Sequence, residues 1–154
     1  MKGLKIKDIS VKAKQGQYGI VFTSWNPSIV QDLLKETKKE LISQGVDETN
    51  IYLKEVPGAF ELPLATLFMA EKEGILSVIS LGAIIRGDTP HFDFISNSCL
   101  EGLQEVSLKT RIPVICGVLT TNTIEQAEER SDPKKMNKGK EFALTALNMV
   151  DSLS

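Results

Sequence analysis

The segment with the clearest chemical potential is residues 86–93, with the sequence RGDTPHFD. It contains the chain's only histidine, His91, directly after Thr89 and Pro90, two residue types that are typical of a helix start. A neutral imidazole there could accept and return a proton, and the backbone N–H groups of Asp88 and Thr89 could bind an anion such as phosphate. An ordinary surface helix cap with an incidental histidine fits the same pattern.

Three other segments carry side chains that could bind a small molecule. Trp25 could stack on a planar heterocycle and Asn26 could hydrogen-bond hydroxyl groups, although a packing tryptophan and a plain helix cap are favoured when these residues are considered alone. Glu61, in the sequence PGAFELP, could accept hydrogen bonds from a polyol or could be a solvated glutamate at a helix start. Arg130 and Lys138 could neutralise a phosphate, but charges at a helix–helix corner are usually only solvated.

The composition and the absence of common motifs exclude several other classes of function. A formal net charge of -2 gives no electrostatic reason to bind nucleic acid or an anionic membrane. Cys99 and Cys116 form no C-x-x-C pair and are not adjacent to His91 in sequence, so neither a disulfide framework nor a metal cluster is predicted. No phosphate-binding Walker loop, dinucleotide-binding glycine pattern or nucleophile elbow is present. The first 16 residues lack a continuous apolar core, which predicts a cytoplasmic protein without a signal peptide or membrane span.

The elements that must position these residues follow from the apolar pattern. Short apolar runs alternate with longer amphipathic ones, which is typical of a parallel sheet covered by helices on both faces. Strands are predicted at residues 18–23, 51–56, 77–85 and 113–119. Helices are predicted at residues 27–44, 60–73, 91–110, between Thr123 and Pro133, and at 137–153. Residues 1–16 are expected to form an N-terminal arm or an edge strand of a single domain over residues 1–154.

Local signals also predict how the helices begin and end. Asn26 is expected to cap the first helix and Thr89 the third, each followed by a proline in the first turn. Thr123 and Gln126 match a capping box, and Gly45 is a natural stop for the first helix. Because the carboxyl ends of parallel strands meet at one edge of a sheet, the segments 24–26, 57–61, 86–91 and 120–123 are expected to gather there.

Taken together, four ordered blocks of the chain resemble the lumazine synthase family. They are VPGAFELP at 56–63, LGAIIRGDTPHFDFI at 81–95, GVLTTNTIEQAEER at 117–130 and NKG at 137–139. The resemblance implies a three-layer α/β/α sandwich with a four-stranded parallel, flavodoxin-like sheet. It also implies a reaction in which 5-amino-6-(D-ribitylamino)uracil condenses with 3,4-dihydroxy-2-butanone 4-phosphate to give 6,7-dimethyl-8-ribityllumazine, with no metal or organic cofactor.

The resemblance further implies roles for individual residues. His91 would move protons, and Asp88, Thr89 and Arg130 would bind the phosphate of the four-carbon substrate. The residues implied to bind the ribitylaminouracil are Trp25, Asn26, Ala59, Phe60, Glu61, Ala83, Ile84, Ile85, Cys116 and Lys138. Because family sites are shared between subunits of a homopentamer, or of a multiple of pentamers, Cys116, Arg130 and Lys138 would come from the adjacent chain.

Three departures from the family pattern leave alternatives open. Ser24 stands where the family usually has Arg, and Cys116 replaces a common Phe beside the ring site. These two residues support the alternative of a catalytically weak homologue that binds flavin or lumazine. Residues 132–136, DPKKM, replace the Gly-rich turn that is typical of members forming sixty-subunit shells. An archaeal-type riboflavin synthase is a further alternative, although that type lacks the RGDTPHFD block.

Overall fold

Four parallel strands form one sheet in the order β2-β1-β3-β4 in the computed structural model, which describes residues 8–154. The strands are β1 (Gln17–Thr23), β2 (Ile51–Val56), β3 (Ile75–Ile85) and β4 (Val114–Thr121). The predicted four-stranded parallel sheet is therefore confirmed. Two predicted ends were wrong: β3 begins earlier than residue 77, and β4 continues beyond residue 119 because Ile84 and Ile85 still pair with Thr120 and Thr121.

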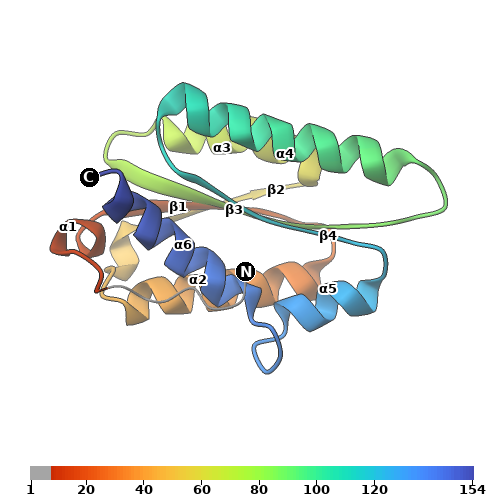
Figure 1. The fold of residues 1–154 in the computed structure, drawn as a ribbon, viewed down its shortest axis with the longest axis horizontal. Coiled ribbons are helices and arrows are strands. Elements are labelled where there is room, and N and C mark those ends of the chain that lie inside the picture. The colour runs from red at the N-terminus through yellow and green to blue at the C-terminus, as the bar shows by residue number, and fades with distance from the viewer. Residues whose placement is uncertain (1–7) are drawn as a thin grey trace.

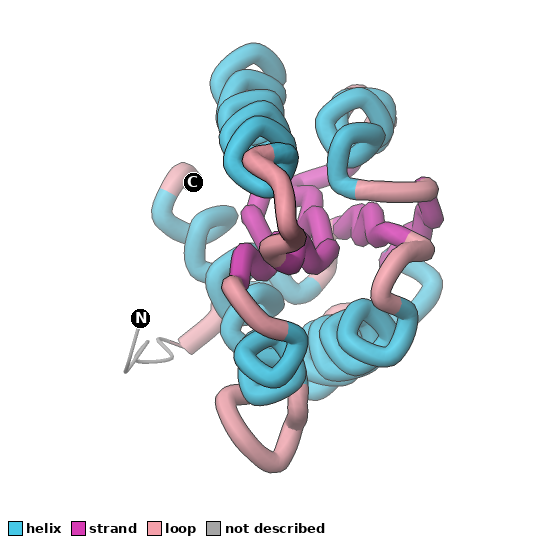
Figure 2. The backbone as a smooth tube through the Cα atoms, turned by 90° about the vertical axis from the view of Figure 1, so that its right-hand side faces the viewer, coloured by secondary structure: helices cyan, strands magenta, loops and turns pink. Residues whose placement is uncertain are grey.

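Helices cover both faces of this sheet, so the predicted three-layer sandwich is also confirmed (Figures 1 and 2). On one face lie α3 (Leu62–Ala70) and α4 (His91–Thr110), which pack against each other. The other face is covered by α2 (Pro27–Ser43), α5 (Ile124–Ser131) and α6 (Lys138–Ser152). Two short 3-10 turns, η1 (Glu48–Asn50) and η2 (Ala59–Glu61), flank β2. None of the helices in the described range is long and apolar enough to cross a membrane.

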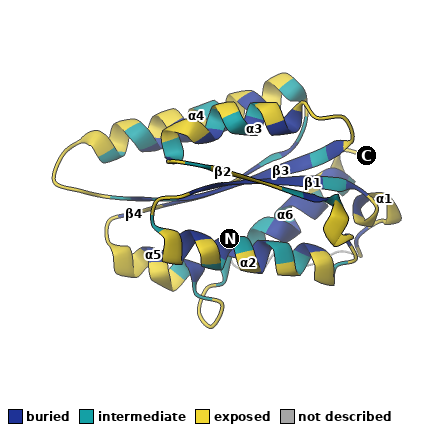
Figure 3. Ribbon diagram, turned by 180° about the vertical axis from the view of Figure 1, so that it is seen from behind, coloured by how far each residue is buried: buried dark blue, intermediate teal, exposed yellow. Residues whose placement is uncertain are grey.

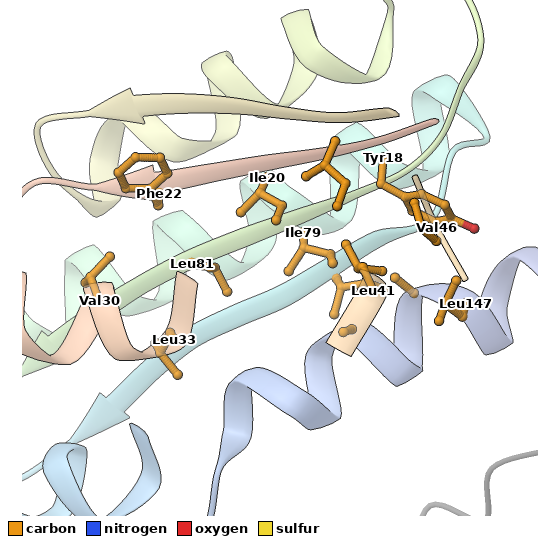
Figure 4. Close-up of a cluster of buried hydrophobic side chains, with 14 of the residues drawn as sticks. Tyr18, Ile20, Phe22, Val30, Leu33, Leu41, Val46, Ile79, Leu81 and Leu147 are labelled. Atoms are coloured by element: carbon orange, nitrogen blue, oxygen red, sulfur yellow. The ribbon is translucent and has the colours of Figure 1, made fainter. Parts of the chain in front are cut away.

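The core consists of two apolar layers, one on each face of the sheet. Successive strand side chains point to opposite faces, so Ile20 and Phe22 pack toward α2 and α6 while Val21 packs toward α3 and α4. Figure 4 shows the first layer, in which Leu33 and Leu41 of α2 and Leu147 of α6 meet the strands. Burial on both faces explains the continuous apolar runs of β1 and β3, which are mostly buried in Figure 3, whereas the edge strand β2 and the outer helix faces are largely exposed.

Most helix boundaries agree with the prediction, with one clear exception. The helix predicted at residues 60–73 was wrong at both ends, because the turn η2 includes Phe60 and α3 spans only Leu62–Ala70. The capping box of α5 is confirmed: the Thr123 hydroxyl accepts from the Gln126 N–H at 3.2 Å, and the Gln126 side chain accepts from the Thr123 N–H at 3.4 Å. Gly45 follows α2 with a φ of 108°, a left-handed conformation that stops the helix.

Two predicted helix caps take a different form. Asn26 has a left-handed backbone (φ 56°, ψ 55°) and no side-chain cap hydrogen bond, because its amide donates to the Ala83 carbonyl instead. The third long helix begins at His91, with Pro90 rather than Thr89 at the cap position. The Thr89 hydroxyl still accepts from the His91 N–H, at 3.4 Å.

The described part of the N-terminal segment is helical rather than extended. Residues 11–14 form the short helix α1 (Val11–Lys14), so the alternative of an edge strand was wrong there. Ser10 ties this segment to α6: its N–H donates to Asp151 Oδ2 at 3.0 Å, and its hydroxyl donates to Asp151 Oδ1. Residues 1–7 of the expected arm lie outside the described part.

Candidate active site

The segments that follow β1 and β2 lie against each other at the carboxyl edge of the sheet. The Ser24 N–H donates to the Val56 carbonyl at 2.8 Å, and the Trp25 N–H donates to the Pro57 carbonyl at 3.3 Å. Trp25 is 70% exposed, and a methyl group added to Gly58 would lie 3.5 Å from its ring. The indole is therefore open to a ligand and is not a packing residue of the core.

Asn26 links the segment after β1 to the end of β3. Its Nδ2 donates to the Ala83 carbonyl at 3.1 Å, across 57 residues of sequence. The left-handed backbone of Asn26 is a conformation that asparagine adopts more readily than most residues. Asn26 therefore joins two of the predicted binding segments, and its amide already has a protein partner.

The turn after β2 is held by its own glutamate. Glu61 Oε2 accepts from the Gly58 N–H at 3.1 Å, which leaves Glu61 Oε1 available to a ligand hydroxyl group. Phe60, on the same turn, is 64% exposed and Ala59 is half-buried. Phe60 and Glu61 also border an open groove of about 990 Å³ beside β2 and α3, which continues along the exposed side chains of Leu64 and Phe68.

The end of β3 leads into the exposed loop that contains the histidine. Ile84 is buried, Ala83 and Ile85 are half-buried, and residues 86–91 are exposed. Within the described residues, the N–H groups of Asp88 and Thr89 donate to no protein acceptor. His91 opens the 20-residue helix α4, whose N-terminal end carries a partial positive charge. The loop therefore combines free backbone donors with an accessible imidazole.

The sequence did not predict the contacts of Arg86, the first residue of this loop. Its Nε donates to Asn122 Oδ1 at 2.9 Å, and its terminal nitrogens lie 3.3 and 3.5 Å from the Asp93 carboxylate. The guanidinium also lies 4.3 Å from the centre of the Phe92 ring. An arginine seven residues before an aspartate is not a helical or strand pairing, so spacing alone gave no signal for this contact.

The side chain of Arg130 lies along α5, next to the segment that follows β4. Its Nη1 donates to the Gln126 carbonyl at 2.9 Å, and Gln126 Oε1 accepts from the Asn122 N–H at 2.9 Å. Through Gln126 and Asn122, Arg130 is thus connected to Arg86 by successive polar contacts.

Two of the predicted residues, Cys116 and Lys138, are not brought to these loops within one chain. Cys116 pairs in register with Ser80, three positions before the pair of Ala83 and Leu119. It borders a second hollow, with Phe142 and Met149 of α6, beside the edge strand β4. The Lys138 ammonium pairs with Glu141 at 2.7 Å in the first turn of α6. Cys116 therefore lies at the hollow beside β4, and Lys138 lies at the start of α6.

The two cysteines are poor nucleophiles at neutral pH. Burial, with a smaller contribution from Cys116, raises the pKa of Cys99 to about 12. Although part of Cys116 reaches solvent, desolvation of its thiol raises its pKa as well. Within residues 8–154, no group of three His, Cys, Asp or Glu side chains gathers as it would around a metal ion.

The chain matches the model of a known protein family. A family model described as 6,7-dimethyl-8-ribityllumazine synthase matches residues 15–154. The matched range includes all four strands, the loops at their carboxyl ends, and the helices α2 to α6.

Proposed function

Because the chain belongs to the 6,7-dimethyl-8-ribityllumazine synthase family, we propose that it is an active synthase of riboflavin biosynthesis. It condenses 5-amino-6-(D-ribitylamino)uracil with 3,4-dihydroxy-2-butanone 4-phosphate and releases the lumazine, one phosphate and two waters. Residues 1–154 act as a single synthase domain in the cytoplasm.

The observation that carries the proposal is the loop between β3 and α4. The Asp88 and Thr89 N–H groups have no protein acceptor, and they lie at the positive end of α4, which suits a phosphate group. His91, in the first turn of the same helix, is exposed beside them. A phosphate held by these donors would place the carbons of its substrate within the range of one imidazole.

The aromatic and apolar residues of the edge suit the other substrate. Trp25 and Phe60 are both exposed, which favours stacking on a planar pyrimidine. Ala83 and Ile85 offer half-buried apolar surface next to Asn26, and Glu61 keeps one carboxylate oxygen for the ribityl hydroxyl groups. The proposal therefore assigns the uracil to the ends of β1 and β3, and its chain to the turn after β2.

The chemistry requires several proton transfers and one departing anion. The uracil amine attacks the ketone carbonyl, and loss of water gives an imine. Loss of the proton from C3 of the four-carbon unit then expels phosphate from C4, and the resulting enol tautomerises to a carbonyl at C3. The ribitylamino nitrogen attacks this new carbonyl, and loss of a second water closes the ring. His91 takes up and returns the protons, for a contribution of about 10²–10⁴-fold, while the α4 N-terminus and Arg130 stabilise the phosphate.

The proposed site is completed by a second copy of the chain. β2 and β4 are the two edge strands of the sheet, and each borders an apolar hollow. Contact between the β2 edge of one subunit and the β4 edge of the next is head-to-tail, and such a contact produces a ring, rather than a two-fold dimer, when the rotation between subunits closes. Cys116, Arg130 and Lys138 of the neighbour then face the groove end at Phe60 and Glu61, consistent with a homopentamer.

Incubating the purified protein with both substrates and following lumazine fluorescence tests the proposal. We expect product to form well above the uncatalysed rate. A protein that binds lumazine without forming it would instead be the carrier-type homologue, and one that converts added lumazine to riboflavin would be a riboflavin synthase. Either outcome would overturn the proposal.

A further inference from the structure

Arg86 holds the loop between β3 and α4 at both of its ends. Its backbone N–H donates to the Thr121 carbonyl at 2.9 Å, so the chain leaves the sheet only after this residue. Its guanidinium meets the carboxylate of Asp93, in the first turn of α4, at 3.3 and 3.5 Å. Residues 87–92, which contain the groups assigned to phosphate binding and proton transfer, are enclosed between these two contacts.

A further contact joins the same guanidinium to the neighbouring loop. Nε donates to Asn122 Oδ1 at 2.9 Å, and Asn122 is itself held by the Gln126 side chain. The Phe92 ring lies 4.3 Å from the guanidinium carbon. Because the guanidinium is planar and rigid, partners on two edges and one face fix its orientation.

Phe92 packs against the apolar layer beneath α3 and α4, but residues 87–91 have few other contacts. A methyl group added to Gly87 would meet no atom within 4 Å. The Asp88 and Thr89 N–H groups have no acceptor among the described residues, and the Thr89 hydroxyl accepts only a long bond of 3.4 Å from His91. N–H groups that bind a phosphate cannot also donate hydrogen bonds within the protein. The loop must therefore be held in place by a side chain outside residues 87–92.

From these contacts we infer that Arg86 is a positioning residue of the synthase. Its side chain ties the loop to Asp93 and Asn122 and so determines where His91 and the free N–H groups lie relative to the substrates. This inference rests on the proposed function. Arg86 acts through the residues of the loop and needs no contact with the reacting atoms.

Steady-state kinetics of Arg86→Ala with both substrates test this role. We expect the KM for the phosphorylated substrate to rise and kcat to fall, each about tenfold or more, because small misplacements of reacting groups are costly. The KM for the ribitylaminouracil should change less than about twofold, since other loops hold it. Arg86→Lys should recover only part of the loss, because an ammonium cannot bond Asn122 and both carboxylate oxygens in one plane.

A matched control and a second measurement separate this role from general destabilisation. Lys38→Ala removes an ion pair of 2.8 Å with Glu48. Glu48 lies just before β2, at the amino ends of the strands, whereas Arg86 lies at their carboxyl ends. This variant should therefore leave all three kinetic constants unchanged. Hydrogen exchange of the Arg86, Asp93 and Phe94 amides, which donate to the Thr121 and Pro90 carbonyls at the two ends of the loop, should quicken in Arg86→Ala and not in Lys38→Ala. Unchanged constants or unchanged exchange in Arg86→Ala would overturn the inference. If the native protein forms no lumazine, the proposed function fails, while the exchange measurement still decides whether Arg86 braces the loop.

Discussion

Several polar side chains of the site already have partners within the chain. Asn26 bonds to the Ala83 carbonyl, Glu61 bonds to the Gly58 N–H, and Arg86 pairs with Asp93. His91 differs, because its ring is exposed at the first turn of α4. Side chains held by partners within the chain, together with an accessible imidazole, suit a site in which one group moves protons while the others position the substrates.

The His91→Ala variant tests that division of roles at the residue scale. Because proton transfer by a positioned imidazole contributes about 10²–10⁴-fold, kcat should fall within that range. The folded assembly should be unaffected, since the side chain removed is exposed. Lumazine fluorescence gives the rate and light scattering gives the mass. A variant as fast as the native protein would remove His91 from the mechanism.

At the scale of elements, α2 and α6 approach each other closely at Gly139. A methyl group at that position would lie 2.7 Å from the Leu33 carbonyl oxygen and 3.0 Å from the Glu36 Cβ. Next to this contact, the Thr37 hydroxyl donates to the Gly139 carbonyl at 3.0 Å, and the Asn137 amide donates to Glu36 at 3.3 Å. The start of α6, which includes Lys138, is therefore positioned by the backbone of α2.

Gly139→Ala should consequently lower the free energy of unfolding by about 1–3 kcal/mol, because the helix backbone cannot easily move away. Gly87→Ala is the matched control, since its added methyl group meets no atom within 4 Å and should change stability by less than about 0.5 kcal/mol. Urea unfolding of both variants provides the comparison. Equal stabilities would mean that the α2–α6 contact adjusts freely.

The whole molecule presents apolar surface at the β2 edge of its sheet. Leu64 is 62% exposed and Phe68 is 68% exposed along the groove that ends at Phe60. Contiguous apolar surface of this kind usually marks an interface, in agreement with the proposed ring. The solution mass of the native protein should therefore be a multiple of its 16.9 kDa chain.

The Phe68→Glu variant should dissociate that assembly, because a carboxylate would be buried without a partner in the proposed contact. Phe68→Leu, which keeps an apolar side chain, should retain the native mass. Analytical ultracentrifugation measures both variants. A native mass for Phe68→Glu would exclude this groove as the contact between subunits.

Stability of the whole fold should decrease in alkali. Burial raises the pKa of Cys99 from 9.0 to about 12, so the thiol ionises first in the unfolded chain. The stability that this group contributes is complete below pH 9 and is lost as the pH rises toward 12. Its slope is roughly 1.4 kcal/mol per pH unit. Burial of Tyr18, with a smaller effect of Asp151, raises the tyrosine pKa and acts in the same direction.

Urea unfolding of Cys99→Ala between about pH 8 and about pH 11 isolates the thiol contribution. The variant should lose less stability over that interval than the native protein, because it has no buried thiol to ionise on unfolding. Parallel curves for the two proteins would show that Cys99 contributes nothing to the alkaline loss.

The sequence by itself determined the four strands, the long helices and the general place of the candidate site. Capping residues and apolar periodicity act over a few residues, so Thr123 with Gln126 predicted α5, and the long amphipathic stretch predicted α4 with both of its ends. The sequence also predicted that the loops after the four strands lie together, because the carboxyl ends of parallel strands meet at one edge of a sheet.

Only the tertiary structure decided which polar groups meet. The Asn26 amide donates to the Ala83 carbonyl, 57 residues later in the chain, instead of capping its own helix. The Arg86 side chain donates to Asn122, 36 residues later. Both contacts depend on the strand order β2-β1-β3-β4, which places the ends of β1 and β4 on either side of β3. No local pattern encodes that order, because it results from how the whole sheet buries its two faces.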